Sequence, residues 1–156
     1  MLWIAYLFLV FLCAGKTYRL RISNVGLQNT LNIRIQEHNM TLVEVEGTHT
    51  VQNTYSSLDV HVGQSLSVLF TADRPAKDYH VVVSARFTNA TLLSTAVVRY
   101  AGSSGLASGP LPAGPTDDVD FSLNQARSIR YTHVSTHLDR STLAVNGDLN
   151  QVDLCI

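Results

Sequence analysis

The chain alternates apolar and polar residues over several short segments. In TYRLRIS (17–23), Tyr18, Leu20 and Ile22 fall on one side and the two arginines between them on the other. LNIRI (31–35) repeats this alternation. A period of two over such lengths is typical of β-strands that bury one face. The pattern predicts these inward-facing core positions: Tyr18, Leu20, Ile22, Val43, Val45, Val60, Val62, Val68, Val82 and Val98.

Turn residues separate these segments and decide the fold class. Further strands are predicted in TLVEVE (41–46), LDVHV (58–62), SLSVLFTA (65–72), YHVVVSARF (79–87) and STAVVRY (94–100). No helical period of any length interrupts them. About seven short strands joined by turns are typical of an antiparallel sandwich or barrel. The sequence therefore predicts an all-β domain over residues 16–100.

The first fifteen residues form an almost unbroken apolar run, MLWIAYLFLVFLCAG. It is shorter than the ~20 residues of a membrane-spanning helix. We interpret residues 1–15 as a secretory signal peptide, with the small residues Cys13, Ala14 and Gly15 near a cleavage point. No Lys or Arg precedes the run, so a leader from a truncated or mis-joined reading frame is the alternative. After cleavage, Cys155 would be the single thiol of the chain.

The composition changes after Tyr100. Residues 101–116 consist largely of Gly, Ser, Pro and Ala, so they predict a linker or long loop with little surface to bury. Residues 117–130 are expected to hold one more short strand. Residues 131–156 show no sustained pattern and predict a poorly ordered tail.

The net charge and two short motifs limit the classes of partner and point to candidate sites of modification. The net charge is −1 with both signs well mixed, which disfavours nucleic acid or an anionic membrane as a partner. Asn39-Met40-Thr41 and Asn89-Ala90-Thr91 are sequons in expected loops, so Asn39 and Asn89 are candidate glycosylation sites of a secreted chain.

The histidines and glutamates of EHNMTLVEVEGTHT (37–50) are the first candidates for metal or acid–base chemistry. Glu44 and Glu46 lie two apart, so both should face solvent. His38 and His49 would lie roughly 30 Å apart on an extended strand at about 3.3 Å per residue, which is too far to share an ion. A polar sheet edge is therefore the preferred interpretation of this stretch.

The other histidines give no stronger signal. His61 and His80 alternate with valines, so surface imidazoles are expected. His133 and His137 have i,i+4 spacing that could bind a metal only on a helix, and the surrounding Thr and Ser residues form helices poorly. No phosphate loop, nucleophile elbow or CxxC motif is present. The sequence predicts no catalytic residue, no metal ligand and no cofactor site in this chain.

Several longer motifs carry a resemblance. YRLRISNVG, H-x-M-x-LVEVEGTHT, LDVHVGQSLSVL leading into TAD, DYHVVVSARF and SLNQARSIR extend over residues 15–130. Together they resemble the middle plastocyanin-like domain of plant multicopper oxidases, in the ascorbate-oxidase-like branch of monocopper oxidase-like proteins. The resemblance implies a cupredoxin-like Greek-key β-sandwich that is incomplete at its N-terminal side, because early family strands should precede GKTYR. An incomplete sandwich would leave an unpaired edge.

The resemblance also implies where copper should and should not be. In the family, the copper ligands are H-x-H pairs and H-C-H clusters of the first and third domains, and neither occurs here. The favoured hypothesis is a secreted, non-catalytic family member of the cell wall or cell surface, whose partners are cell-wall components or missing oxidase domains. One alternative is a domain of a copper-dependent oxidoreductase whose ligands lie elsewhere. Another is an adhesion-type extracellular β-sandwich.

Overall fold

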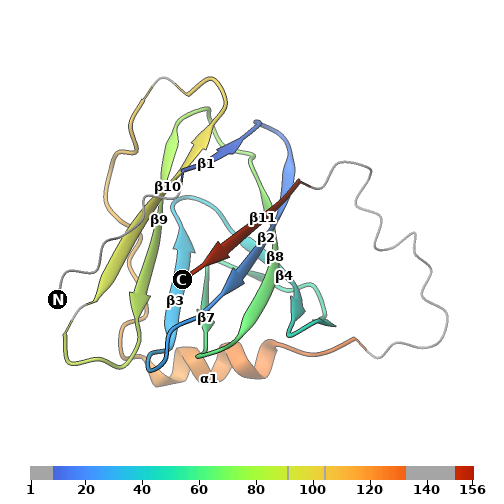
Figure 1. The fold of residues 1–156 in the computed structure, drawn as a ribbon, viewed down its shortest axis with the longest axis vertical. Helices are drawn as coiled ribbons and strands as arrows, with labels where there is room; N and C mark the ends of the chain where they lie inside the picture. Colours follow the sequence, from blue (N-terminus) through green and yellow to red (C-terminus); the bar gives the residue numbers. More distant parts are fainter. Residues whose placement is uncertain (1–8, 91, 104, 133–149) are drawn as a thin grey trace.

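The computed structural model describes residues 9–90, 92–103, 105–132 and 150–156, with backbone only at 9–11 and 150–155. Two β-sheets pack face to face, and one helix lies across one end of the sandwich (Figure 1). The predicted all-β sandwich is confirmed. Among the described residues, no helix is long and apolar enough to cross a membrane.

The strands divide into two sheets. The first sheet has the order β1 (Leu9–Leu12), β10 (Leu93–Tyr100), β9 (Asp78–Ala85), β3 (Leu31–Ile35) and β7 (Ser57–Val60). The second has the order β11 (Asn150–Cys155), β2 (Thr17–Ser23), β8 (Ser65–Thr71), β4 (Met40–Val45) and β5 (Thr48–His49), with β6 (Thr54–Tyr55) paired to β4. The pairs are antiparallel except for β1 with β10 and β11 with β2, which are parallel.

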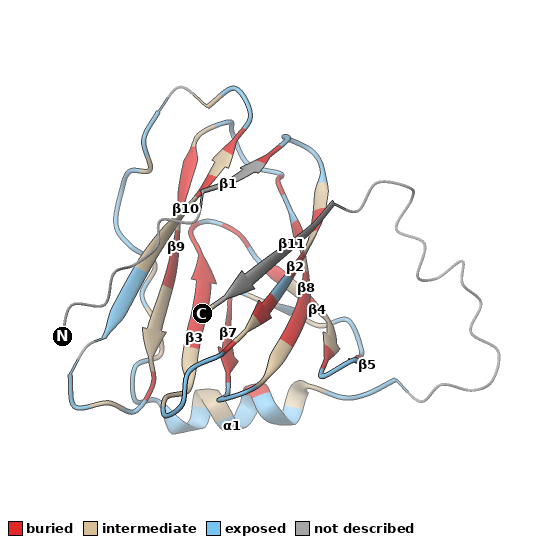
Figure 2. Ribbon diagram, viewed as in Figure 1, coloured by how far each residue is buried: buried red, intermediate tan, exposed pale blue. Residues whose placement is uncertain are grey.

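The core lies between the sheets, at the positions that the alternation predicts in most strands. Figure 2 shows the buried strand centres and the exposed loops. Of the predicted core positions, these are buried: Tyr18, Leu20, Ile22, Val45, Val60, Val68, Val82 and Val98. The alternation holds because each strand buries one face against the opposite sheet.

Three predicted core positions differ from the prediction. Val43 is only half-buried because a β-bulge between Leu42 and Glu44 interrupts the alternation. Val62 is 46% exposed because β7 ends at Val60. Val82 is buried, but it pairs with Arg34 on the outer face of the first sheet and is not part of the inter-sheet cluster.

Residues 101–116, expected as a linker, form a long loop that packs against β3. Arg34 Nε donates to the carbonyl of Pro112 at 2.7 Å, and Gln36 Nε2 donates to that of Ser108 at 2.9 Å. A Cβ at Gly114 would lie 2.7 Å from Arg34 Cζ, so only glycine fits here without a shift. Polar side chains of the sheet therefore hold a segment that has few large side chains of its own.

The predicted short strand within residues 117–130 is instead a helix, α1 (Val119–Ser128). Asp118 caps its start by accepting a hydrogen bond from the Phe121 amide at 2.9 Å. The Gln125 side chain accepts from the Asp59 amide and donates to the Ser57 carbonyl, at 2.7 and 2.9 Å. The Gln125 side chain therefore satisfies two backbone hydrogen-bonding groups of β7, which is an edge strand of the first sheet.

Segments near the two chain ends supply one edge strand of each sheet. β1 lies within the segment interpreted as a leader, and Leu12 is 1% exposed. β11 lies within the expected unpatterned tail and pairs with β2 from Tyr18 to Ser23. The unpaired edge expected from missing early strands is thus occupied in both sheets. Whether residues 1–15 are removed stays a prediction, and their removal would also remove β1.

Candidate functional site

The described histidines are scattered over the fold. His49 and His61 are exposed and His80 is half-buried on β9. His38, expected at a polar sheet edge, is instead 5% exposed and lies in the core. Within the described residues, no group of three or more His, Cys, Asp or Glu side chains could hold a metal ion. His133 and His137 lie outside the described residues.

The geometry around His38 is that of a structural histidine. Nδ1 lies 2.6 Å from the Gln36 carbonyl oxygen, which can only accept, so Nδ1 carries the proton. Nε2 then accepts from the Tyr100 hydroxyl, also at 2.6 Å. The rings of Phe70 and Tyr79 lie 4.7 and 4.6 Å from the imidazole. Both ring nitrogens are occupied, so neither is available to a metal or a substrate.

Burial shifts the acid–base equilibria of this pair in opposite directions. It lowers the pKa of His38, because the buried imidazolium loses its hydration. It raises the pKa of Tyr100 to about 12, because the phenolate would lose hydration in the same way. Both groups are therefore neutral near pH 7, and the pair acts as a polar link between β10 and the turn that joins β3 to β4.

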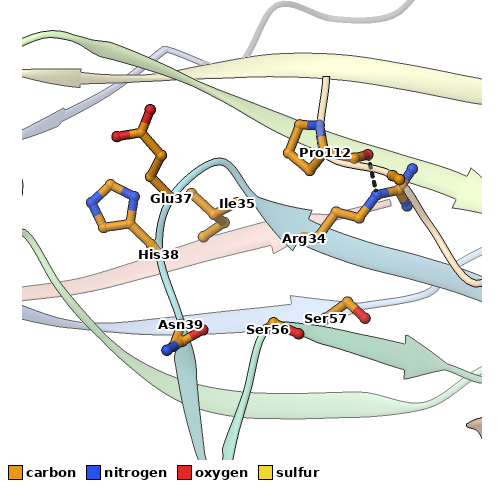
Figure 3. Close-up of a pocket in the computed structure, with 9 residues that line it drawn as sticks. Arg34, Ile35, Glu37, His38, Asn39, Ser56, Ser57 and Pro112 are labelled. Atoms are coloured by element: carbon orange, nitrogen blue, oxygen red, sulfur yellow. Dashed lines mark hydrogen bonds between the residues drawn. The ribbon is translucent and has the colours of Figure 1, made fainter. Parts of the chain in front are cut away.

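A shallow open pocket of about 260 Å³ lies beside this turn (Figure 3). It is lined by Arg34, Ile35, Glu37, His38, Asn39, Ser56, Ser57, Pro112 and Ala113. The two serines have no free histidine in the pocket to act as a base, because both nitrogens of His38 are engaged. Glu37 pairs with Lys77 at 2.9 Å. The pocket is polar, but its groups do not form a nucleophile–base pair.

A buried charge network joins α1 to the first sheet. Arg86 and Asp59 pair at 3.3 Å, with side chains 0% and 4% exposed. Asn32 donates to the same carboxylate at 2.7 Å, and Ser122 of α1 donates to it at 2.5 Å. Arg86 also donates to the carbonyl of Asp118 at 2.7 Å. The alternation in LDVHV (58–62) gives no sign of this network, because it predicts Asp59 on the solvent-facing side of the strand, and no helical period predicts α1.

The two candidate glycosylation sites are both exposed. Asn39 is at the rim of the pocket, immediately before β4, and Asn89 is in the loop between β9 and β10. Exposure meets the steric requirement for a glycan but does not test whether one is attached. Both sites stay predictions.

Glu44 and Glu46, both expected to face solvent, differ in their exposure. Glu46 is exposed at the β4–β5 turn and accepts a hydrogen bond from the Ser65 amide at 2.5 Å. Glu44, expected in solvent, pairs with Arg19 across the second sheet and its side chain is only 12% exposed. Neither carboxylate belongs to a metal-binding group.

A comparison with models of protein families identifies the family to which this chain belongs. A family model described as multicopper oxidase matches residues 5–103, which is more than half of the chain. The chain belongs to the multicopper oxidase family. The match begins inside the apolar N-terminal run and includes β1.

Curated relatives place the chain in one branch of the multicopper oxidase family. The L-ascorbate oxidase homolog of Nicotiana tabacum is 55% identical over 121 residues, covering 76% of this chain and 22% of that protein. The monocopper oxidase-like protein SKU5 of Arabidopsis thaliana is 54% identical over 124 residues, covering 75% and 21%. The resemblance to monocopper oxidase-like proteins is confirmed, and the chain spans about a fifth of the length of these relatives.

Solved structures confirm the cupredoxin-like fold of multicopper oxidases. Fet3p, a multicopper oxidase that functions in iron import, superposes with a TM-score of 0.60 at 24% identity, covering 69% of this chain and 22% of Fet3p. The L499M mutant of the laccase from B. aclada gives a TM-score of 0.57 at 26% identity, covering 71% and 21%.

The described residues do not fit the copper that the multicopper oxidase family implies. A blue-copper site needs two imidazoles and a thiolate around one centre. Here His38 is fully engaged in the core, and Cys13 is an exposed thiol just after β1. The side chain of Cys155 is outside the described set. No reaction step is therefore assigned to copper in this chain.

Proposed function

We propose that this chain is a non-catalytic plastocyanin-like domain of a secreted multicopper oxidase family protein, acting in the cell wall or at the cell surface. The observation that carries the proposal is the engagement of His38, one of the two histidines in the stretch 37–50. Both of its ring nitrogens are hydrogen-bonded within the core, so this imidazole is not available to bind a metal. The branch assignment supports a plant protein of this family, and the expectation of secretion rests on the apolar run of residues 1–15.

Copper content tests the non-catalytic role. The full chain, purified from plant cells and dialysed against a chelator, should hold no stoichiometric copper, show no intense blue absorption and consume no oxygen with ascorbate. His133 and His137 lie in a Thr- and Ser-rich segment that forms helices poorly, so any Cu(II) they bind is expected to be lost to the chelator. Chelator-resistant copper with intense blue absorption would refute the proposal and support an intrinsic oxidase.

The second candidate is a domain of a copper-dependent oxidoreductase whose ligands lie in other parts of a longer protein. The fact that favours it is the coverage, because about four-fifths of the length of these relatives lies outside the part that matches this chain. Sequencing the full transcript distinguishes the two candidates. An open reading frame that continues into H-x-H and H-C-H motifs would favour the oxidoreductase.

Secretion and glycosylation form the remaining part of the proposal. We expect the chain in the apoplast, with glycans on Asn39 and Asn89. Mass spectrometry of material secreted by plant cells, before and after glycosidase treatment, measures both modifications and the N-terminus. An intracellular chain with an intact Met1 and two unmodified asparagines would contradict secretion.

A further inference from the structure

Arg34 is a buried cation on the outer face of the first sheet. It is 6% exposed, and on β3 it pairs with Ser57 of β7 and Val82 of β9. Its Nε donates to the Pro112 carbonyl at 2.7 Å, and its Nη1 donates to the Ser84 hydroxyl at 2.8 Å. Both acceptors are neutral, so these hydrogen bonds replace part of the lost hydration without balancing the charge.

The buried charges around Arg34 have a positive surplus. Asn32 accepts from Arg34 Nη1 at 3.2 Å and donates to the Asp59 carboxylate at 2.7 Å. Asp59 already pairs with Arg86, and no other described Asp or Glu forms an ion pair with Arg34 or Arg86. Burial lowers the pKa of Arg34, because the charged form loses hydration, but a guanidinium stays protonated at pH 7. Two guanidinium groups therefore share one carboxylate, and an anion would restore the balance.

The second terminal nitrogen of Arg34, Nη2, is free to bind a ligand. No acceptor within the described ranges takes a hydrogen bond from it, since the bonds of this side chain come from Nε and Nη1. Arg19 Nε is the one fully buried side-chain nitrogen or oxygen without a partner among the described residues, so Nη2 is not sealed from solvent. Arg34 lines the pocket of about 260 Å³. Figure 3 shows its guanidinium beside Pro112 on one side of the pocket and Glu37, the partner of Lys77, on the other.

The other groups of the pocket suit a sugar ring. The side chains of Ser56, Ser57 and Asn39 line it and make no hydrogen bond to another described residue. Hydroxyl and amide groups can both donate to and accept from the hydroxyls of a sugar. Ile35 and Pro112 add apolar surface for the C–H groups of a ring. A volume of about 260 Å³ is slightly below the roughly 300–1,000 Å³ of pockets for drug-sized ligands, so the pocket suits one ring-sized group.

We propose that Arg34 and this pocket bind the carboxylate of an acidic sugar, a uronate. The planar guanidinium pairs with a carboxylate through charge-assisted hydrogen bonds, and the ring hydroxyls bond to the two serines and to Asn39. Binding needs no metal and no reaction step. The inference names a ligand class for the proposed cell-wall role, and it rests on that proposed function only for the source of the uronate, a polysaccharide or a free sugar acid.

The test is a calorimetric titration of the full chain, produced without glycosylation so that Asn39 is unmodified, with a trimer of galacturonate. The matched neutral probe is the methyl ester of the same trimer, which keeps the rings and removes the charge. We expect the acid to bind about ten-fold or more tightly than the ester, and its affinity to fall as salt is added. Equal affinities for acid and ester, or no binding of the acid, would overturn the proposal.

Two smaller probes separate the sources of the ligand. Monomeric galacturonate that binds as tightly as the trimer would support the uronate site with a free sugar acid as its ligand. Binding of the trimer alone would support it with a polysaccharide as the source. Acetate that binds as tightly as the sugar acids would refute sugar recognition.

A charge placed in the pocket tests the location of the site. Ser56→Asp adds a carboxylate at an exposed lining position, and Ser94→Asp, exposed on β10 and not part of the lining, is the matched control. We expect S56D to weaken binding of the acid trimer about ten-fold or more and S94D to leave it unchanged, with similar thermal unfolding of both. Equal binding by these two variants would contradict the proposal.

Arg34→Gln removes the guanidinium itself and should abolish binding of the acid trimer. Because Arg34 is buried, this variant counts only if its thermal unfolding stays cooperative, and S56D decides the matter otherwise. Copper in the isolated chain would refute the proposed non-catalytic role and leave this binding test unaffected. A copper-free chain that does not bind the acid trimer would refute the uronate site alone.

Discussion

His38 shows at the scale of one residue how burial sets a pH dependence. Its pKa is lowered by desolvation in the folded state, whereas in the unfolded chain it lies near the ordinary histidine value of 6.5. The imidazole thus binds a proton more readily when unfolded, so stability is highest above this value. The stability should fall as pH drops from 6.5 through the lowered pKa of the folded state.

Urea unfolding from pH 8 to pH 5 measures this contribution. His38→Leu leaves the Tyr100 hydroxyl without its acceptor, which should cost about 1–3 kcal/mol of unfolding free energy at pH 8. The same variant should lose much of the decline between pH 6.5 and pH 5. His49→Gln, at an exposed position, is the matched control. Parallel pH profiles for His38→Leu and the parent chain would contradict the assignment.

Residue burial was only partly predictable from alternation. Alternation indicates which side chains of a strand point to the same face of the sheet. It therefore placed Tyr18, Ile22 and Val68 correctly in the core. It could not locate His38, which lies in a turn and is buried by Tyr100, 62 positions away. Asp59 was misplaced for a related reason, because its face is covered by α1 and by Arg86. Long-range partners of polar residues leave no periodic signal.

At the scale of the element, α1 stabilises the edge of β7 through one side chain. Gln125→Ala would leave the Asp59 amide and the Ser57 carbonyl without this partner at a buried site. We expect a loss of about 1–3 kcal/mol in unfolding free energy, measured by urea denaturation. Asn124→Ala, on the exposed side of α1, should change stability by less than about 0.5 kcal/mol. Equal effects of the two variants would exclude this role of Gln125.

α1 was missed in the sequence because its buried face is polar. Gln125 is its one buried residue, so no apolar stripe of period 3.6 exists to be found. The signal that was available is the cap, since Asp118 precedes a run of moderate helix formers. The bulge at Val43 likewise has no local signature, because it depends on the pairing of β4 with β8.

β1 provides a second prediction at this scale. Leu12 is 1% exposed, and its carbonyl accepts from the Ala101 amide at 2.6 Å. A chain that begins at Lys16 should therefore be less stable by several kcal/mol, because β10 loses its paired edge and the core loses Leu12. Thermal unfolding of the two chains measures the difference. Equal stabilities would show that β1 contributes nothing and would favour the leader interpretation.

At the scale of the whole molecule, the two sheets are closed by strands from opposite ends of the sequence. A chain of residues 16–132 lacks both β1 and β11, and so exposes the edges of β10 and β2. Such edges pair with other chains. We expect this fragment to associate at micromolar concentration, whereas residues 9–156 should be less prone to do so, as measured by sedimentation velocity. A monodisperse monomer of the fragment would show that these edges are protected by other means.

The place of β11 also has a consequence during protein synthesis. Its partner β2 leaves the ribosome roughly 130 residues earlier, and ribosomes add about 5–20 residues per second, so the β2 edge lacks its neighbour for about 6–26 s. β1, by contrast, is made before β10 and is already present when that strand emerges. The nascent chain can therefore complete its first sheet well before its second. Until β11 has been made, the unpaired edge of β2 is the place where a chaperone would bind.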